Sequence, residues 1–134
     1  LGGLAAASTA DYLATTGREV TIVARDYAVG AHIDHTTRPA VERRLREGGV
    51  RQLAGTEVVA VSGDGLTLRD CFTGRVWRLP GVDTVVYDVG ARARDELYRT
   101  LVAAGVDAHR VGDCLAPRGL EEAYHEGFHT ALAL

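Results

Sequence analysis

The sequence predicts an α/β fold with a doubly wound, mainly parallel sheet and a β-hairpin insertion. Helical segments alternate with short apolar strands along the 134 residues, which is the pattern of a parallel sheet covered by helices. A hairpin pattern interrupts this alternation near the middle of the chain. The chain also opens on a helix, whereas folds of this kind open on a strand, so the first strand is expected to be missing.

The chain begins with two helices on either side of a strand. Residues 4–16 are rich in alanine and lead to Gly17, which predicts a helix that ends at this glycine. Residues 18–24 are largely β-branched and apolar, which predicts a strand. Residues 36–47 are expected to form the second helix, since one of the two threonines at its start can cap it and Pro39 is tolerated in a first turn.

Strand patterns follow in the middle of the chain. Residues 56–61 alternate between apolar and polar side chains, as a half-buried strand does. Residues 66–69 and 75–79 flank a loop that contains glycine, which predicts a hairpin. Residues 83–88 are apolar enough to predict a strand that is buried on both faces.

The last third of the chain returns to the alternation of helices and strands. Residues 95–104 predict a helix that ends at Gly105, and residues 108–112 predict the last strand. Residues 119–134 predict the last helix. Elements in this order are typical of Rossmann-like folds.

The composition excludes several kinds of function. The net charge of −3 is not that of a nucleic-acid-binding surface. All 15 basic residues are arginines, so the chain has no lysine for a phosphate-binding P-loop or a Schiff base. Cys71 and Cys114 lie far apart, which favours a reduced, cytoplasmic setting over a disulfide framework. No apolar run is long enough to cross a membrane. The chain contains no Met, which predicts that it is a fragment or has been processed.

A zinc-protease pattern stands near the end of the chain, in His125-Glu126-Gly127-Phe128-His129. On a helix, the two histidines would share one face and could bind one Zn²⁺ ion, whose water Glu126 would polarise. A catalytic zinc needs a third protein ligand, and none of the five residues after His129 is a zinc ligand. No metal site is therefore expected, and a zinc hydrolase is the least favoured alternative.

Two places in the first half could contact a nucleotide. Gly2 and Gly3 stand just before the first helix, where glycines let the backbone approach a pyrophosphate, although a flexible terminus is the alternative. Arg25 and Asp26 follow the strand whose end selects the ribose, where Arg favours NADP and Asp favours NAD. A solvated pair of loop charges is the alternative for these two residues.

A third place lies at Gly112 and Asp113, where the expected last strand ends. A carboxylate at the carboxyl edge of a parallel sheet lies where ligands bind, so Asp113 could accept a hydrogen bond from a sugar or ribityl hydroxyl. The positive N-terminus of the following helix could face a phosphate or a flavin. Alternatively, Asp113 only turns the chain.

Several features of residues 85–134 occur together. They are a strand that leads to Gly90, the run Asp95-Glu96-Leu97-Tyr98, the pair Gly112-Asp113 with Ala116-Pro117-Arg118, and the run His125-Glu126-Gly127-Phe128 with Ala131. With these features the segment resembles the C-terminal region of the NADH:flavin oxidoreductases typified by 2,4-dienoyl-CoA reductase, trimethylamine dehydrogenase and histamine dehydrogenase. Residues 1–25 resemble the nucleotide-binding subdomain of the same family.

This resemblance implies two cofactor-binding parts. Residues 1–88 would be an NAD(P)H-type Rossmann-like subdomain without its first strand, and residues 89–134 would be the returning segment of a FAD- or ADP-binding subdomain. No catalytic residue is expected in this chain. The expected cofactor-binding residues are Gly2, Gly3, Arg25, Gly90, Gly112, Asp113, His125, Glu126 and Gly127.

The resemblance also implies a larger parent enzyme, in which this region follows a (β/α)₈ barrel with FMN and a 4Fe-4S cluster. The chain would be the dinucleotide-binding module of that flavin- and iron–sulfur-dependent oxidoreductase and would be inactive alone. Its partners would be the nucleotide cofactor and the rest of the parent polypeptide, and a homo-oligomer is compatible with this role. The alternative is a vestigial Rossmann-like scaffold that binds no nucleotide. The substrate of the parent and the choice between NAD and NADP stay open.

Overall fold

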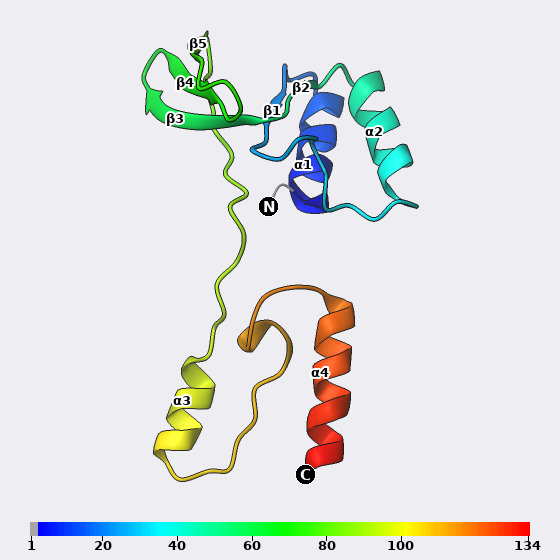
Figure 1. Cartoon of the computed structure of the whole chain (residues 1–134), viewed down its shortest axis with the longest axis vertical. Coiled ribbons are helices and arrows are strands. Elements are labelled where there is room, and N and C mark those ends of the chain that lie inside the picture. Colours follow the sequence, from blue (N-terminus) through cyan, green and yellow to red (C-terminus); the bar gives the residue numbers. More distant parts are fainter. Residues whose placement is uncertain (1–2) are drawn as a thin grey trace. The chain divides into compact units, whose positions relative to one another are not determined.

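The computed structural model describes residues 3–134 (Figure 1). The chain divides into two compact units, Leu1–Val89 and Gly90–Leu134. No helix in the described part is long and apolar enough to span a bilayer. In chain order the elements are α1 (Leu4–Thr15), β1 (Thr21–Val23), α2 (Arg38–Glu47), β2 (Arg51–Leu53), β3 (Thr56–Ser62), β4 (Gly65–Asp70), β5 (Val76–Pro80), α3 (Glu96–Ala103), the 3₁₀ helix η1 (Gly112–Cys114) and α4 (Leu120–Ala133).

The first unit is built around a parallel pair of strands, β1 and β2, in which Ile22 lies opposite Gln52. Helix α1 precedes β1 and helix α2 precedes β2, so each strand is reached from a helix. The apolar core consists of the buried side chains of Ala7, Ala10, Ile33, Leu45 and Val50. This core fixes both helices relative to the strand pair.

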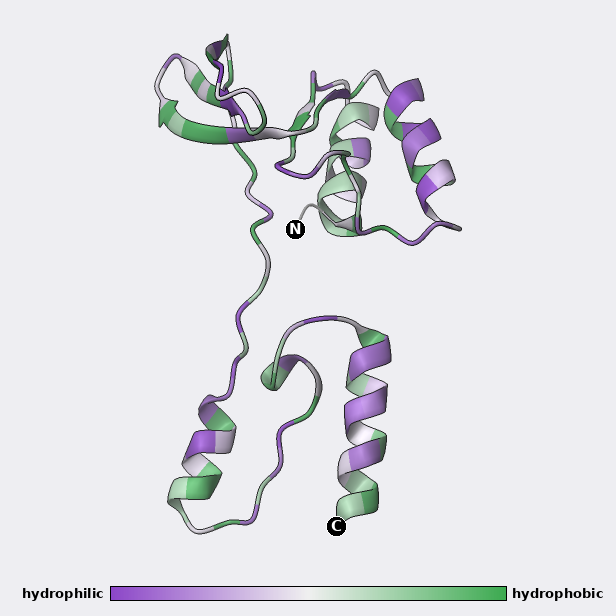
Figure 2. Ribbon diagram, viewed as in Figure 1, coloured by the Kyte–Doolittle hydropathy of each residue, from purple (hydrophilic) through white to green (hydrophobic). Residues whose placement is uncertain are grey.

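The two helices of the first unit differ in polarity. Figure 2 shows α1 mainly in hydrophobic colours and α2 mainly in hydrophilic colours. Helix α2 buries only Leu45, and its Arg44 forms an ion pair of 2.5 Å with Asp11 on α1. Leu45, the partly buried Val41 and this ion pair hold one side of α2, and its polar side is available for solvent or a ligand.

Backbone hydrogen bonds hold the segment after β1 against the segment after β2. The N–H of Ala24 donates to the carbonyl of Leu53 at 2.9 Å, and the N–H of Thr56 donates to the carbonyl of Ala24 at 2.9 Å. The N–H of Gly55 donates to the carbonyl of Asp26 at 2.7 Å. The carboxyl ends of both parallel strands are thus fixed side by side.

Strands β3, β4 and β5 form a three-stranded antiparallel sheet. Leu68 of β4 pairs with Trp77 of β5 and is completely buried. Gly65 begins β4 with a φ of +138°, and a Cβ at this position would collide with the carbonyl oxygen of Leu79. Only glycine fits there without strain. The predicted hairpin is confirmed as the β4–β5 part of this sheet.

The second unit is ordered mainly by polar contacts. Among residues 90–134, Gly112 alone is buried. The carboxylate of Asp95 accepts hydrogen bonds from Arg99 at 3.0 Å and from Arg110 at 2.8 Å, and the Arg110 guanidinium lies 4.7 Å from the centre of the Tyr98 ring. The hydrogen bond from Arg99, followed by the positive charges of both arginines, holds the pKa of Asp95 below its ordinary value.

The predicted fold class is confirmed, because helices cover a parallel strand pair and a hairpin sheet is inserted after it. Two of the predicted strands are nevertheless wrong, since residues 83–88 and 108–112 form no strand. A strand needs a neighbour for its backbone N–H and C=O groups, and the described residues place none beside these segments. Most side chains of residues 83–88 are exposed instead of buried, for example that of Tyr87 at 62%.

Strand β2 was not predicted, because three residues carry too little pattern to be recognised. The observed units divide between Val89 and Gly90. The assignment of one cofactor to residues 1–88 and another to residues 89–134 remains a prediction.

Candidate functional site

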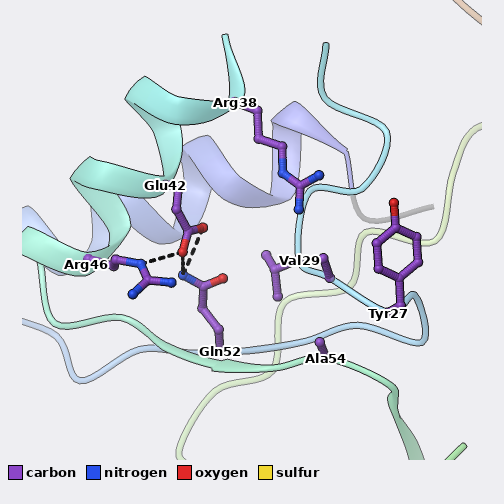
Figure 3. A pocket seen from close by; sticks show the side chains of 8 residues that line it. Tyr27, Val29, Arg38, Glu42, Arg46, Gln52 and Ala54 are labelled. Atoms are coloured by element: carbon purple, nitrogen blue, oxygen red, sulfur yellow. Dashed lines mark hydrogen bonds and ion pairs between the residues drawn. The ribbon is translucent and has the colours of Figure 1, made fainter. Parts of the chain in front are cut away.

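A hollow of about 400 Å³ lies at the carboxyl edge of the parallel pair in the first unit (Figure 3). Three segments surround it, namely the loop after β1, the end of β2 with the residue that follows it, and one face of α2. The residues that line it are Tyr27, Ala28, Val29, Arg38, Glu42, Arg46, Gln52 and Ala54. Ligands of open α/β sheets bind at this edge, so the hollow is the candidate site of the first unit.

The charges in the hollow are unevenly paired. Glu42 accepts hydrogen bonds from Nε of Arg46 at 2.6 Å and from Nε2 of Gln52 at 3.3 Å. Arg38 is half-buried, and Figure 3 shows its guanidinium extending from α2 toward Val29. Within residues 3–134 this guanidinium has no hydrogen bond or ion pair. The lining therefore carries one uncompensated positive charge.

The start of α2, from which Arg38 extends, is fixed by Asp34. The Asp34 carboxylate accepts hydrogen bonds from the hydroxyl and the N–H of Thr36 and, at 2.9 Å, from the N–H of Thr37. These hydrogen bonds, first among them the one from the Thr36 hydroxyl, hold the pKa of Asp34 far below its ordinary value. Thr37 stands at the N-cap, as predicted, but its side chain makes no capping hydrogen bond to the helix.

The side chains of Arg25 and Asp26, which could distinguish the ribose of NADP from that of NAD, both contact other side chains of the chain. Nε of Arg25 lies 3.4 Å from Glu57, and the Arg25 side chain is 79% exposed. Glu57 also accepts a hydrogen bond from Nε of Arg69 at 2.6 Å. The carboxylate of Asp26 lies 3.5 Å from Nε2 of His32. Neither Arg25 nor Asp26 lines the hollow.

Among residues 3–134, none fills the space at the N-terminus of α1. Gly3 is its N-cap, and a Cβ at Gly3 would meet no atom within 4 Å. The first turn of α1 has no acidic side chain, so its free N–H groups can face an anion. A short turn joins α1 to β1, so the helix starts at the same edge at which β1 ends. Gly2, the other predicted glycine, lies outside the described residues.

In the second unit, a closed turn brings Gly112 and Glu126 together. The N–H of Gly112 donates to Oε2 of Glu126 at 2.7 Å, and the other carboxylate oxygen of Glu126 is ion-paired with Arg118. Gly112 has a φ of +63°, and a Cβ there would lie 3.1 Å from the Cβ of Ala123. Asp113 is exposed beside this turn and has no hydrogen bond or ion pair with the described residues. The turn therefore presents the Asp113 carboxylate to solvent.

The histidines of the zinc-protease pattern lie on the exposed surface of α4. Nε2 of His125 is 3.1 Å from Nε2 of His129, and the ring centres are 4.4 Å apart. Glu126 does not join them, since its carboxylate is bound to Gly112 and Arg118. Residues 3–134 contain no group of three His, Cys, Asp or Glu side chains that could hold a metal ion.

The two remaining predicted glycines are in open positions. A Cβ at Gly127 would meet no atom within 4 Å, so α4 leaves room beside it. Gly90 is exposed and has a φ of +92°, which lies in the region that glycine favours. Binding of a cofactor by Gly90, Gly127, Asp113 and His125 remains a prediction.

Comparison with known families and proteins gives one clear result. The sequence model of the family described as "Pyridine nucleotide-disulphide oxidoreductase" matches residues 2–116. A metal reductase of Desulforamulus reducens is 27% identical over 115 residues, which are 86% of this chain and 17% of that protein. A bilirubin reductase of Mediterraneibacter gnavus is 32% identical over 134 residues, which are 99% of this chain and 20% of that protein. The chain thus spans about a fifth of the length of these curated relatives.

Solved structures with the same fold include three large redox enzymes. The 6-hydroxypseudooxynicotine amine oxidase of Pseudomonas geniculata N1 matches with a TM-score of 0.82 and 28% identity, over 91% of this chain and 19% of that one. Histamine dehydrogenase from Rhizobium sp. 4-9 matches with a TM-score of 0.84 and 23% identity, over 99% of this chain and 22% of that one. A 2-naphthoyl-CoA reductase matches with a TM-score of 0.82 and 22% identity, over 99% of this chain and 20% of that one.

These comparisons confirm the predicted resemblance to NADH:flavin oxidoreductases of the histamine dehydrogenase type. The hollow was not predicted from the sequence, although one signal for it was present. Arg38, Glu42 and Arg46 are spaced four residues apart, which places them on one face of a helix. The segments that complete the hollow lie elsewhere in the chain, so only the fold reveals it.

Proposed function

Because the chain belongs to the pyridine nucleotide-disulphide oxidoreductase family, we propose that it is the dinucleotide-binding module of a flavin-dependent oxidoreductase and holds NAD(P)H in its first unit. The observation that carries this proposal is the hollow at the carboxyl edge of β1 and β2, with the uncompensated Arg38 in its lining. Its volume of about 400 Å³ lies in the range of sites for small molecules.

The residues of the first unit fit a dinucleotide. The open N-terminus of α1 at Gly3 offers free N–H groups to a pyrophosphate, and the hollow offers space and a cation to the adenosine end. When bound, the nicotinamide supplies the chemistry of hydride transfer. The residues of this chain bind and orient the cofactor and carry out no bond-making step.

The second unit has a different proposed role, which is to contribute to a FAD- or ADP-binding site. Asp113 would accept a hydrogen bond from a ribityl or ribose hydroxyl, since its carboxylate is exposed and has no partner among the described residues. Glu126 would position the turn that carries Asp113 by binding the N–H of Gly112. Gly90, His125 and Gly127 would lie beside the cofactor, and Gly127 would leave room for its approach.

The complete enzyme would extend beyond this chain. The relatives are about five times as long, and by their names they act on a metal, bilirubin or amines. In the proposed enzyme, a (β/α)₈ barrel with FMN and a 4Fe-4S cluster would carry the substrate chemistry, and this chain alone would be inactive. The rest of the parent polypeptide would be its partner, in a reduced, cytoplasmic setting, and a homo-oligomer is compatible with this role.

The test is isothermal titration of the protein at its full natural length with NADH, NADPH and ADP. We expect at least one nicotinamide nucleotide to bind with one site per chain. The variant Ala54→Trp fills the hollow with a bulky side chain and should abolish this binding. Ala91→Trp, at an exposed position of the second unit, is the matched control and should bind as the unaltered protein does. Binding of neither NADH nor NADPH would favour the scaffold alternative.

A further inference from the structure

We infer that the nucleotide held in the first unit carries a phosphate on its adenosine ribose, as NADPH does, and that Arg38 selects it. This inference rests on the function proposed above and makes it more specific. It concerns the lining of the hollow in Figure 3, which contains none of the cofactor-binding residues expected from the sequence.

The charges of the hollow favour an added anion. Arg46 and Gln52 donate hydrogen bonds to the carboxylate of Glu42, and these three side chains together carry no net charge. The guanidinium of Arg38 has no such partner within residues 3–134, although Arg38 is partly buried. A partly buried cation without a partner is unfavourable, and an incoming anion removes that penalty.

The chemistry of Arg38 suits a phosphomonoester. A guanidinium presents five N–H donors in a planar fork, which binds two phosphate oxygens at once. A ribose phosphate carries close to two negative charges at neutral pH and three acceptor oxygens. An unphosphorylated ribose offers only hydroxyl groups, which compensate no charge. The hollow is thus better matched to the phosphorylated nucleotide.

The residues that would select an unphosphorylated ribose are already engaged. At the end of the second strand of such folds, an acidic side chain binds the ribose 2′-hydroxyl, whereas an arginine nearby accommodates a 2′-phosphate. Here the acidic residue is Asp26, whose carboxylate lies 3.5 Å from Nε2 of His32. The arginine that the sequence places at this point, Arg25, is turned to Glu57 at 3.4 Å. Arg38 is therefore the arginine of this edge that is available to the ligand.

The first experiment compares the affinities of NADPH and NADH for the unaltered full-length protein, measured by isothermal titration. A charge-assisted, two-point contact should make NADPH bind about 10- to 100-fold more tightly. The affinity for NADPH should also fall more steeply than that for NADH as the salt concentration rises. Equal affinities, or tighter binding of NADH, would overturn the inference and leave the proposed function standing. Binding of neither nucleotide would overturn both.

The second experiment assigns the preference to Arg38. Arg38→Gln should lower the affinity for NADPH and so remove most of the preference for NADPH over NADH. It should change the affinity for NADH less than about 2-fold. Arg43→Gln is the matched control, because Arg43 lies on the same helix, is 71% exposed and does not line the hollow. Thermal unfolding checks that each variant is folded. If Arg38→Gln does not fold, Arg38→Lys replaces it. This variant keeps the positive charge but loses the planar guanidinium, so it should show an intermediate preference for NADPH over NADH. A loss of affinity that is equal for both nucleotides would contradict the role of Arg38.

Discussion

In the part of the chain that the structure describes, all nine buried apolar side chains belong to the first unit, and none belongs to Gly90–Leu134. The second unit instead depends on hydrogen bonds around Asp95 and Glu126. It exposes large apolar side chains, such as those of Leu97, Leu120 and Leu132, at 72%, 82% and 70%.

This difference separates two ways of building a cofactor site. In the first unit, a packed core fixes the helices and strands that surround the hollow, so that site is formed within the chain itself. In the second unit, a single hydrogen-bonded turn presents Asp113, and no packed core supports it. We therefore expect the first site to be organised without help and the second to depend on neighbouring structure.

The largest effect is expected from a cavity in the core of the first unit. Leu45→Ala should lower the free energy of unfolding by about 2–5 kcal/mol, because Leu45 is only 1% exposed. Leu120→Ala removes a side chain of the same size from an 82% exposed position and should change stability by less than about 0.5 kcal/mol. Urea unfolding followed by far-ultraviolet circular dichroism measures both. Equal losses would show that the two units do not differ as described.

Two glycines of the second unit should respond in opposite directions. Gly112→Ala forces a side chain into a φ of +63° and against Ala123, which should destabilise the junction of η1 and α4 by about 1–3 kcal/mol. Gly127→Ala adds a methyl group in open space on a helix and should stabilise α4 by about 0.5–1 kcal/mol. Amide hydrogen exchange along α4 reports both changes. Faster exchange in Gly127→Ala would mean that Gly127 is needed for another reason.

The ion pair of Glu126 should matter less than its hydrogen bond. Glu126→Gln keeps an acceptor for the N–H of Gly112 and loses the ion pair with the partly exposed Arg118, which should cost at most about 1 kcal/mol. Glu126→Ala removes both interactions and should cost more. The exchange rate of the Gly112 amide distinguishes the two variants. If both variants exchange equally fast, the ion pair rather than the hydrogen bond closes the turn.

The smallest effect concerns Asp34 and depends on pH. Because its pKa is lowered in the folded chain, the ionised carboxylate stabilises the start of α2 above the unfolded pKa of about 3.9. This contribution should be lost as the pH falls from there toward the folded pKa. Asp34→Asn should therefore lower the urea midpoint at pH 7 and make the loss on acidification less steep. Asp83→Asn, at an exposed position, is the control, and an identical pH profile for Asp34→Asn and the unaltered chain would contradict this role.

Local signals in the sequence predicted the elements that depend on local chemistry. Gly17 and Gly105 both have a positive φ just after α1 and α3, as expected for glycines that follow a helix. The predictions of strands at 83–88 and 108–112 were wrong because a strand needs a neighbouring strand to pair with, and an apolar run in the sequence does not reveal one.

The candidate sites could be predicted only where neighbours in sequence are also neighbours in space. Gly112 and Asp113 were predicted from the end of an expected strand and Glu126 from a motif on the last helix, and their binding of a cofactor remains a prediction. The hollow was missed because it joins the loop at Tyr27, the end of β2 and one face of α2, and their proximity depends on the parallel pairing. The hydrogen bond that occupies Glu126 was equally invisible in the sequence, since the residue pattern suggested a ligand rather than a support for the turn.

The central claim is that a nicotinamide nucleotide binds at the carboxyl edge of β1 and β2. The most direct test is to titrate the isotopically labelled protein with NADPH and to map the changes in backbone NMR chemical shifts. We predict that the shifts concentrate in residues 27–29, in α2 and at Ala54, with further shifts in the first turn of α1. Shifts that occur only in α3 and α4, or no shifts at all, would contradict the claim.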